Sequence, residues 1–461
     1  MCRGLLKIFR WALGSLLILI HRPAALPENK KALGIAPRSL GAILLTVGLL
    51  AGWDAVAADS AVDSGASASV NGSARAGLWS KSRSLDQESD IATGEGALWA
   101  KAQLDLGTVG DANFDGWVGD QSRGNSVGNR WNRYERLREL YWRKSAGDVD
   151  LSLGPQIIVW GRADAIKPTD NLTPRDFTLL TPEDGDQRFG NFATSATYHI
   201  GEYAVQSVWL PTFQTSVIPL RPVSMVSYRY DSPPRRNQLA FKFDYTGREL
   251  DWSLSYFDGY DTIPDLALVG VGPSGVTVGL TNHHLRVWGA DASWSVGRYA
   301  LRGEVASMRP DAEEAGAFAH KHPQTWLVIG GERSFGEHLN VNLQYFAQKV
   351  AGFSSPDDLA DPIAREVAWQ QAATANQIAG FQQGFTLRLA WNWANDSWHA
   401  ETSTIFSVTN NARLWRGRLV HAPDDHWRIN FGFDRYGGPD HSLFGALKDN
   451  STLFNELRYV F

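Results

Sequence analysis

The chain ends in TLFNELRYVF (residues 452–461), and this stretch decides the fold. On a β-strand, successive side chains point to opposite faces. One face then carries four apolar residues: Leu453, Leu457, Tyr459 and Phe461. Glu456 and Arg458 lie on the other face. An apolar outside and a charged inside are typical of a strand in a membrane β-barrel, which contacts lipid on one side and water on the other.

The same two-residue period recurs upstream of this strand. It is clear in LAFKFDY (239–245), LNVNLQYF (339–346), GFQQGFTLRLAWNW (380–393) and HWRINFGFDRY (426–436). Alternation of apolar and polar residues predicts strands. Soluble β-sandwiches also contain two-faced strands, so the alternation alone does not identify a membrane protein.

The connections between these segments alternate in length. Short turns, mostly of glycine and polar residues, fall near 107, 145, 199, 245, 295, 334, 393 and 423. Long polar connections fall at 123–134, 162–187, 214–235, 260–282, 310–322, 353–380 and 437–451. Tight periplasmic turns that alternate with long external loops are typical of an outer-membrane barrel.

The pattern therefore predicts an all-β fold, a single closed antiparallel transmembrane β-barrel of about 18 strands. It begins near Ser67 and ends at Phe461, and 16 strands result if the first hairpin and 407–423 are not strands. We expect the last strand to pair with the first, because an open edge in lipid leaves backbone groups unsatisfied. Leu457, Tyr459 and Phe461 resemble the C-terminal signature that such barrels present to the barrel assembly machinery.

Composition narrows the alternatives. Hydrophobic residues make up 43% of the 461 residues, which is too few for a helical membrane protein. Trp is abundant, with 19 residues, and it favours membrane interfaces. A soluble all-β protein with an aromatic core is the alternative on composition alone. Cys2 is the only cysteine, so the processed chain is expected to form no disulfide.

The first 57 residues are expected to form a signal peptide region. Basic residues precede an apolar run at 40–52, and Ala55-Val56-Ala57 supplies a small-x-small cleavage site, with cleavage after Ala58 as the rival. The first 30 residues are surplus and indicate either an unusually long signal or a translation start further in. Residues 58–461 are then the barrel, secreted through the inner membrane and inserted into the bacterial outer membrane.

Cleavage leaves an acidic chain. It removes seven of the 44 basic residues and two of the 49 acidic ones, which gives a net charge of −10. This charge argues against a nucleic-acid partner. The expected partners are outer-membrane lipid, the assembly machinery and a transported solute that the sequence does not identify.

One long connection, which follows the fifth strand, mixes both signs of charge and contains Pro168, Pro174 and Pro182. Its charged residues are Arg162, Asp164, Lys167, Asp170, Arg175, Asp176, Glu183, Asp184, Asp186 and Arg188. In position and charge this segment resembles the third external loop of general porins. The resemblance implies a loop that folds into the barrel and narrows it, where facing charges would orient polar solutes. The alternative is a solvated surface loop.

Charged residues of inward parity are expected to line the wall of the lumen. They are Arg136, Arg138, Lys242, Asp244, Arg388 and Arg428. Arg136 and Arg138 face inward only if a bulge changes the phase of their strand or if Leu140 and Trp142 also face the lumen. They would then form, with Arg388 and Arg428, a basic track opposite the acidic loop residues. Pro155 implies a bulge or a strand end, because proline donates no backbone hydrogen bond.

Residues 134–177 resemble a family of uncharacterised proteobacterial outer-membrane, porin-like barrels. The matching motifs are Leu137-Arg138-Glu139, Trp160-Gly161-Arg162-Ala163-Asp164 and Pro168-Thr169-Asp170, followed by Pro174 and Asp176. Pro155 stands where a basic residue is commoner in that family. The family resemblance implies transport. The layout is also similar to alginate-export barrels, which implies a polysaccharide cargo.

The sequence predicts a channel, not an enzyme. No nucleophile and base are fixed by spacing, no HExxH motif occurs, and no cofactor or metal is expected. His283 and His284 are the only candidates for catalysis that merit a test, and His199 lies at a short turn. Two alternatives to a porin-like channel stay open: a substrate-specific export or uptake barrel for hydrophobic or polysaccharide cargo, and a non-transport structural or adhesive barrel.

Overall fold

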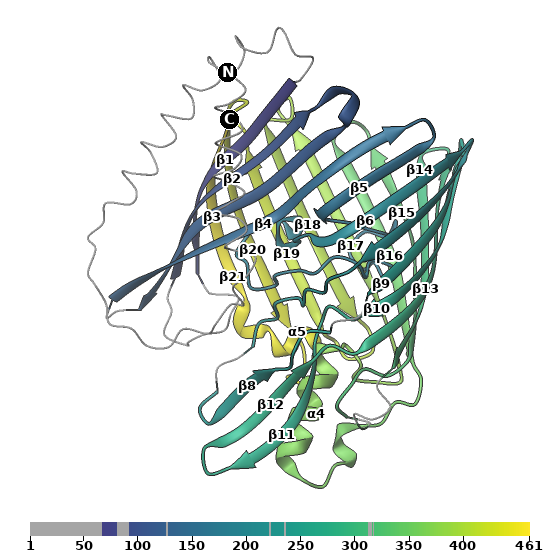
Figure 1. Cartoon of the computed structure of the whole chain (residues 1–461). Helices are drawn as coiled ribbons and strands as arrows, with labels where there is room; N and C mark the ends of the chain where they lie inside the picture. The colour runs from purple at the N-terminus through teal and green to yellow at the C-terminus, as the bar shows by residue number, and fades with distance from the viewer. Residues whose placement is uncertain are drawn as a thin grey trace, which may run out of the picture. The chain divides into compact units, whose positions relative to one another are not determined.

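The computed structural model describes residues 67–80, 92–125, 128–220, 223–234, 237–311, 316 and 318–461, without the side chains of 121–134. The expected signal peptide region, residues 1–57, lies outside the described residues. Eighteen strands form one antiparallel sheet in which each strand pairs with the barrel strand next in the chain (Figure 1). These strands are β1 (Ser67–Trp79), β2 (Ala92–Asp105), β3 (Asp111–Asn125), β4 (Gly128–Ala146), β5 (Val149–Gln156), β6 (Asn191–Ile200), β7 (Tyr203–Leu210), β9 (Gln238–Thr246), β10 (Leu250–Tyr260), β13 (His284–Val296), β14 (Tyr299–Asp311), β15 (Gln324–Phe335), β16 (Leu339–Val350), β17 (Phe381–Trp393), β18 (Trp398–Ser407), β19 (Arg413–His421), β20 (Trp427–Gly437) and β21 (Thr452–Val460).

The last strand closes the sheet against the first, as predicted. The register of β21 on β1 runs from Ser73 opposite Val460 to Trp79 opposite Phe454. Beyond it, the backbone groups of Gly72 and Phe461 exchange hydrogen bonds of 2.9 and 3.0 Å. No backbone edge is left open at this seam, which confirms the closed barrel of 18 strands.

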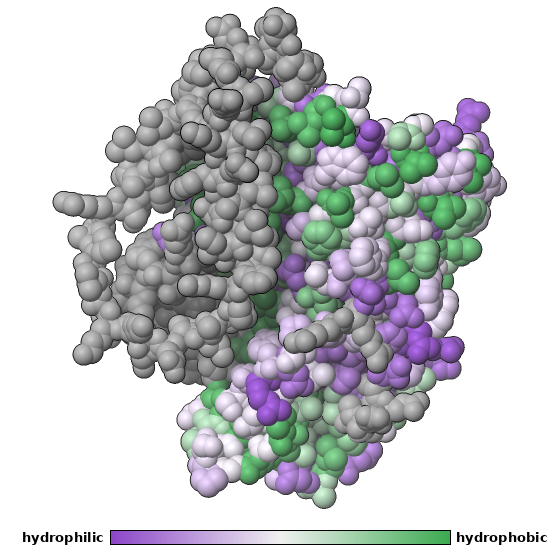
Figure 2. Space-filling view, viewed as in Figure 1, coloured by the Kyte–Doolittle hydropathy of each residue, from purple (hydrophilic) through white to green (hydrophobic). Residues whose placement is uncertain are grey.

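The two faces of the strands differ as the alternation predicted. In β21, Leu453 and Leu457 are 67% and 43% exposed, whereas Glu456 is buried at 6%. Phe381, Phe385 and their equivalents on neighbouring strands are exposed in the same way. Figure 2 shows apolar side chains spread over the strand wall. An apolar outer face on a closed sheet identifies a transmembrane barrel, and barrels of this kind belong to the bacterial outer membrane.

The eight predicted short turns all connect consecutive strands, and the long connections lie at the other end. The prediction of a long loop at 123–134 was wrong. There β3 continues to Asn125 and β4 begins at Gly128, with the two strands paired throughout. Polar residues can extend a hairpin beyond the apolar zone, because backbone hydrogen bonds hold the pair without any apolar face.

Three external connections, between β7 and β9, β10 and β13, and β16 and β17, contain strands or a longer helix that alternation did not predict. Strands β8 (Val226–Tyr230), β11 (Asp265–Gly272) and β12 (Gly275–Thr281) form a separate three-stranded sheet. Helix α4 (Pro362–Thr374) packs on β11, and Figure 1 places both at the end of the barrel opposite the C-terminus. The shorter pieces are α5 (Leu443–Ala446) and the 3₁₀ turns η1 (Gly107–Val109), η2 (Asp184–Gln187), η4 (Pro356–Asp358) and η5 (Lys448–Asn450).

Helix α4 begins where its sequence indicates. The Asp361 carboxylate accepts a hydrogen bond from the backbone N–H of Ala364 at 2.7 Å, and Pro362 occupies the first turn. Within the described ranges, no helix is long and apolar enough to cross a membrane.

Candidate functional site

The segment between β5 and β6, residues 157–190, is called here the long loop. It begins where the strand can no longer pair on both sides. Gly154 has φ +129°, and a Cβ there would lie 2.3 Å from a carbonyl oxygen of β4. Pro155 is the penultimate residue of β5, in agreement with the predicted strand end. The Glu139 carboxylate then accepts the backbone N–H of Ile157 at 2.8 Å, which ties the start of the long loop to β4.

The first half of the long loop contacts the wall formed by β9 and β13–β17. Arg162 forms an ion pair with Asp291 of β13 and lies 3.6 Å from Asp244 of β9. Asp164 pairs with Arg388 of β17 at 3.0 Å. These partners are up to 224 residues away in sequence, so the first half of the long loop lies against strands on the far side of the sheet from β5.

A buried wall carboxylate holds this half of the loop. Glu304 of β14 is 2% exposed and accepts hydrogen bonds from the N–H and the hydroxyl of Thr169, both at 2.8 Å. Its second oxygen accepts the N–H of Ala163 at 3.1 Å. Gly161 has φ +87°, and a Cβ there would lie 2.7 Å from both carboxylate oxygens. The Trp160–Asp164 and Pro168–Asp170 motifs of the sequence therefore fold around Glu304.

Replacement of Glu304 by Ala should release this turn of the loop. It would leave two backbone N–H groups and one hydroxyl unsatisfied, at a cost of about 1–3 kcal/mol each. We expect a lower free energy of unfolding in urea and a noisier open-channel current. Glu332→Ala is the matched control, because Glu332 bonds only to wall residues such as Arg302 and Asn340. Equal effects of the two substitutions would contradict this role for Glu304.

The middle of the long loop is cross-linked by its own charges. Asp170 pairs with Arg188 and, at 3.3 Å, with Arg175. These ion pairs tie together the two ends of the segment 170–188. Asp176 pairs with Arg136 of β4 at 2.7 Å. A bridge between residues 175 and 188 and another between 176 and 217 extend this order to the backbone. The charges of this segment are thus mostly paired rather than solvated.

The predicted bulge in β4 occurs at Arg138. Asp115 of β3 pairs with Glu139 and Gly116 with Leu137, so the strand gains one residue there and its inward parity changes. Arg138 donates to Asp115 at 2.7 Å and to two carbonyl groups of the long loop. Both Arg136 and Arg138 therefore contact the long loop from the wall.

The second half of the long loop contacts a different part of the wall. Four wall arginines pair with its acidic residues: Arg75 with Asp186 at 2.6 Å, Arg416 with Asp184, and Arg418 and Arg458 with Glu183 at 3.4 and 3.3 Å. These arginines lie on β1, β19 and β21, on both sides of the seam. The long loop is therefore bonded to strands around most of the sheet.

These four arginines were missed by the sequence analysis, although their parity carried a signal. Arg416 and Arg418 alternate with the exposed Trp415, and Arg458 follows the exposed Leu457. A charged residue between lipid-facing neighbours must face inward. The sequence contains many such residues, and their pairing with Glu183 follows only from how the loop crosses the barrel.

Among the described residues, three further predicted residues take no direct part in the ion pairs of the long loop. Arg428 does not join a basic track opposite the loop, because its guanidinium donates to the carbonyl groups of Asp424 and Trp427 in the adjoining short turn. Lys242 pairs with Asp244 along the wall of β9 at 2.7 Å. Lys167 has no ion pair within 4 Å in the part of the chain that the structure describes.

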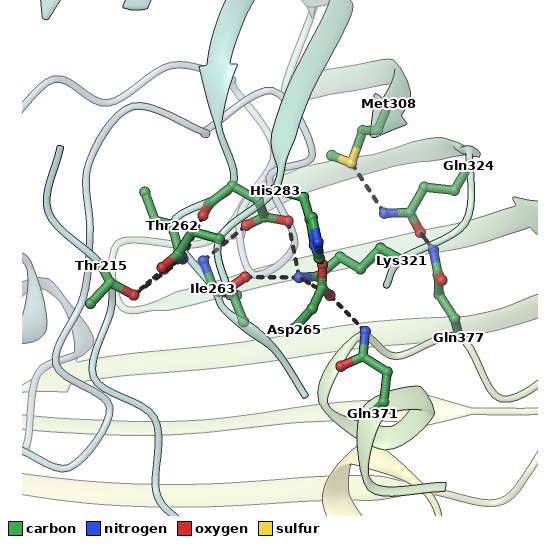
Figure 3. Close-up of polar contacts among 12 residues, drawn as sticks. Thr215, Thr262, Ile263, Asp265, His283, Met308, Lys321, Gln324, Gln371 and Gln377 are labelled. Carbon is green, nitrogen blue, oxygen red and sulfur yellow. Dashed lines mark hydrogen bonds and ion pairs between the residues drawn. The ribbon is translucent and has the colours of Figure 1, made fainter. Parts of the chain in front are cut away.

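The external connections meet at a second, buried polar cluster (Figure 3). The Lys321 ammonium donates to the Ile263 carbonyl at 2.8 Å and to Asp265 at 3.0 Å, and lies 3.2 Å from Asp261. Asp265 also bonds His283 at 2.7 Å and Gln371 of α4 at 2.6 Å. This cluster joins the connections at 261–283, 318–323 and 353–380.

The buried pair keeps both members charged. Burial alone would raise the pKa of Asp265, but Lys321 and hydrogen bonds from His283, Lys321 and Gln371 outweigh it and lower the pKa to about 2. Burial would lower the pKa of Lys321, but Asp261 and Asp265 raise it instead. The ordinary pKa is 3.8 for an aspartate carboxyl and 10.5 for a lysine ammonium. The ion pair therefore stabilises the external connections fully at any pH between these two values.

Lys321→Met should loosen these connections, because Asp265 would be left buried without its cation, at a cost of about 3–5 kcal/mol. We expect faster limited proteolysis of the external connections in the folded barrel. Lys349→Met, at an exposed lysine that has no ion pair with any described residue, is the control. In the unmodified protein, hydrogen-exchange protection of 261–283 should fall as pH drops from about 4 toward 2. Unchanged proteolysis in Lys321→Met would contradict this role.

The candidate catalytic histidines are engaged in these external contacts. His283 bonds Asp265, and His284 bonds Asp258 at 2.7 Å. His199 bonds Asp150 at 2.9 Å beside its short turn. Among the described residues, no group of three or more His, Cys, Asp or Glu side chains is placed to hold a metal ion.

Comparisons with known proteins agree on the fold. Acinetobacter baumannii OccAB1 matches with 10% identity and a TM-score of 0.52 over 86% of this chain and 96% of that chain. A. baumannii OccAB4 matches with 9% identity and a TM-score of 0.50, covering 86% and 98%. A BenF-like porin from Pseudomonas fluorescens Pf-5 matches with 8% identity and a TM-score of 0.51, covering 86% and 98%.

Sequence comparison gives less. No family model matches this chain, and no curated protein matches it. The motif resemblance of residues 134–177 therefore gains no further support. At identities near 10%, the three structures establish the architecture: this chain has the barrel fold of outer-membrane porins.

Proposed function

We propose that this protein is an outer-membrane channel whose lumen is narrowed by the long loop between β5 and β6. The observation that carries the proposal is the set of ion pairs between that loop and distant strands. Asp164 reaches Arg388 on β17, and Asp186 reaches Arg75 on β1. A loop that leaves β5 and is bonded to β17, half of the sheet away, would lie across the path of a solute.

The polar lining favours hydrophilic solutes. Inward residues of the wall include the partly exposed side chains of Lys242, Arg388 and Glu401, which are 15%, 29% and 26% exposed. Such a lining offers hydrogen bonds to water and polar solutes and little apolar surface. A conduit for hydrophobic cargo would need the reverse, so this alternative is weaker than a channel for polar solutes.

The C-terminal strand supports a proposal for assembly. Leu457, Tyr459 and Phe461 occupy the outward parity of β21, and the Phe461 ring covers Gly72, where a Cβ would lie 2.5 Å from it. We propose that these residues are recognised by the assembly machinery before the seam closes. The rings become part of the seam once β1 pairs with β21.

Planar-bilayer recording of the purified mature chain tests the channel. We expect discrete conductance steps without added ligand, since the charges that line the path are held by wall contacts. A folded barrel that inserts but conducts no ions would overturn the proposal and favour an export conduit opened by a partner.

A further inference from the structure

The outward face of the barrel carries exposed cations where the apolar wall ends. Lys349 is the penultimate residue of β16, Arg413 the first of β19 and Arg435 the third from last of β20. Each lies at the external end of its strand and is exposed. These three residues are called here the outer basic rim.

The strand register fixes the outward direction of the rim. Leu343, Trp415 and Phe431, at the same parity on the same three strands, are 52%, 47% and 52% exposed. The rim therefore lies directly beyond lipid-facing apolar and aromatic side chains. Trp415 and its neighbours place this level near the interface between hydrocarbon and headgroups.

Two rim arginines are neighbours of like charge. Arg413 pairs in register with Gly437, and Arg435 pairs with Trp415 on the same two strands, so the arginines are diagonal neighbours. Diagonal positions are about 7–8 Å apart. In the described part of the chain, no carboxylate pairs with Arg413, Arg435 or Lys349 within 4 Å.

The lumen provides a contrast on the same strands. Arg416, three residues after Arg413, pairs with Asp184 and lies 3.3 Å from Asp434. Inward arginines are thus neutralised by the chain itself, whereas the outward arginines beside them are not. Unpaired like charges on one face of a sheet are destabilising. This indicates that an anion from outside the chain neutralises the two arginines.

A second pair lies at the same level on β13 and β14. Arg286 and Arg309 are directly opposite each other and both exposed. This pair is partly compensated, because Arg286 lies 3.4 Å from the exposed Asp311, and the Arg309 guanidinium lies 5.4 Å from the ring centre of Trp288. The outer basic rim on β16–β20 is therefore the stronger anion site.

We propose that the outer basic rim binds the phosphate groups of the outer-leaflet glycolipid. Guanidinium groups bind phosphate oxygens through paired hydrogen bonds, and the headgroup level is where an outward cation meets them. The aromatic residues below the rim would contact the acyl chains of the same lipid. This lipid site is independent of conduction through the lumen.

Native mass spectrometry of the full processed chain in detergent, with added diphosphoryl lipid A, tests the proposal. The test variant is Lys349→Gln/Arg413→Gln/Arg435→Gln. Each cation near an anionic surface contributes about fivefold to binding, so the triple variant should bind about a hundredfold more weakly. Lipid A stripped of its phosphates should bind the unmodified chain and the variant equally.

Arg333→Gln is the matched control. Arg333 is an outward cation at the opposite end of β15, where the rings of Tyr299 and Phe335 cover it at 4.8 and 4.6 Å. Its replacement should leave lipid A binding unchanged. Heat-modifiable mobility and conductance should show that all variants fold. Equal binding of diphosphoryl lipid A by the folded triple variant, or no preference of the unmodified chain for the phosphorylated form, would overturn the proposal.

Discussion

Deletion of Lys167 to Asp184, with the gap closed by a glycine–serine linker, should raise the single-channel conductance severalfold. The deletion removes Asp170 and Asp176, which cross-link the middle of the long loop. It also removes Thr169, which bonds Glu304 of β14, and Glu183, which pairs with Arg458 of β21. If the long loop narrows the lumen as proposed, the deletion would leave a path bounded by the barrel wall alone. Planar-bilayer conductance of the folded variant is the measurement.

The control for this deletion is a second truncation, made in an external segment outside the lumen. Replacing the tip of the β11–β12 hairpin, residues 270–275, shortens an external segment in which Val271 is 58% exposed and a Cβ at Gly270 or Gly272 would meet open space. It should leave the conductance unchanged. If the deletion variant folds, inserts and conducts like the unmodified chain, the long loop does not narrow the lumen.

Arg388→Glu should shift the reversal potential strongly toward cation preference. Arg388 lies 3.0 Å from Asp164 and 3.4 Å from Glu401, so the substitution turns a cluster of one cation and two carboxylates into three adjacent carboxylates. Fixed charge at a narrow point sets ion preference, and repulsion of Asp164 would also loosen the loop. The reversal potential in a salt gradient is the readout, and Arg388→Gln should give a smaller shift in the same direction.

Arg428→Glu separates this effect from a general change of charge. Arg428 has inward parity, but among the described residues its guanidinium bonds to carbonyl groups of a short turn and to no residue of the long loop. The same charge change there should move the reversal potential much less. An equal shift in both variants would show that ion preference is set by the net charge of the lumen and not by the contact between Arg388 and Asp164.

The sequence predicted the strands of the barrel wall and their two faces well, but it did not predict which side chains pair inside the barrel. Alternation placed Leu457 outward and Glu456 inward, because membrane and water demand opposite side chains on one strand. Alternation did not predict β8 and α4, because external segments do not contact lipid and their sequences need not alternate between apolar and polar residues. It also placed a loop at 123–134, where polar residues continue the hairpin.

The sequence by itself determined the barrel, a count of about 18 strands with 16 as the alternative, and the position of the charged loop after the fifth strand. These features depend on local rules: side-chain parity, turn residues and the need to close a sheet in lipid. Only the tertiary structure decided that Glu304 holds residues 163–169 and that Arg458 reaches Glu183. Such contacts depend on how the closed wall brings residues more than a hundred positions apart together across the lumen, and no local pattern encodes that distance.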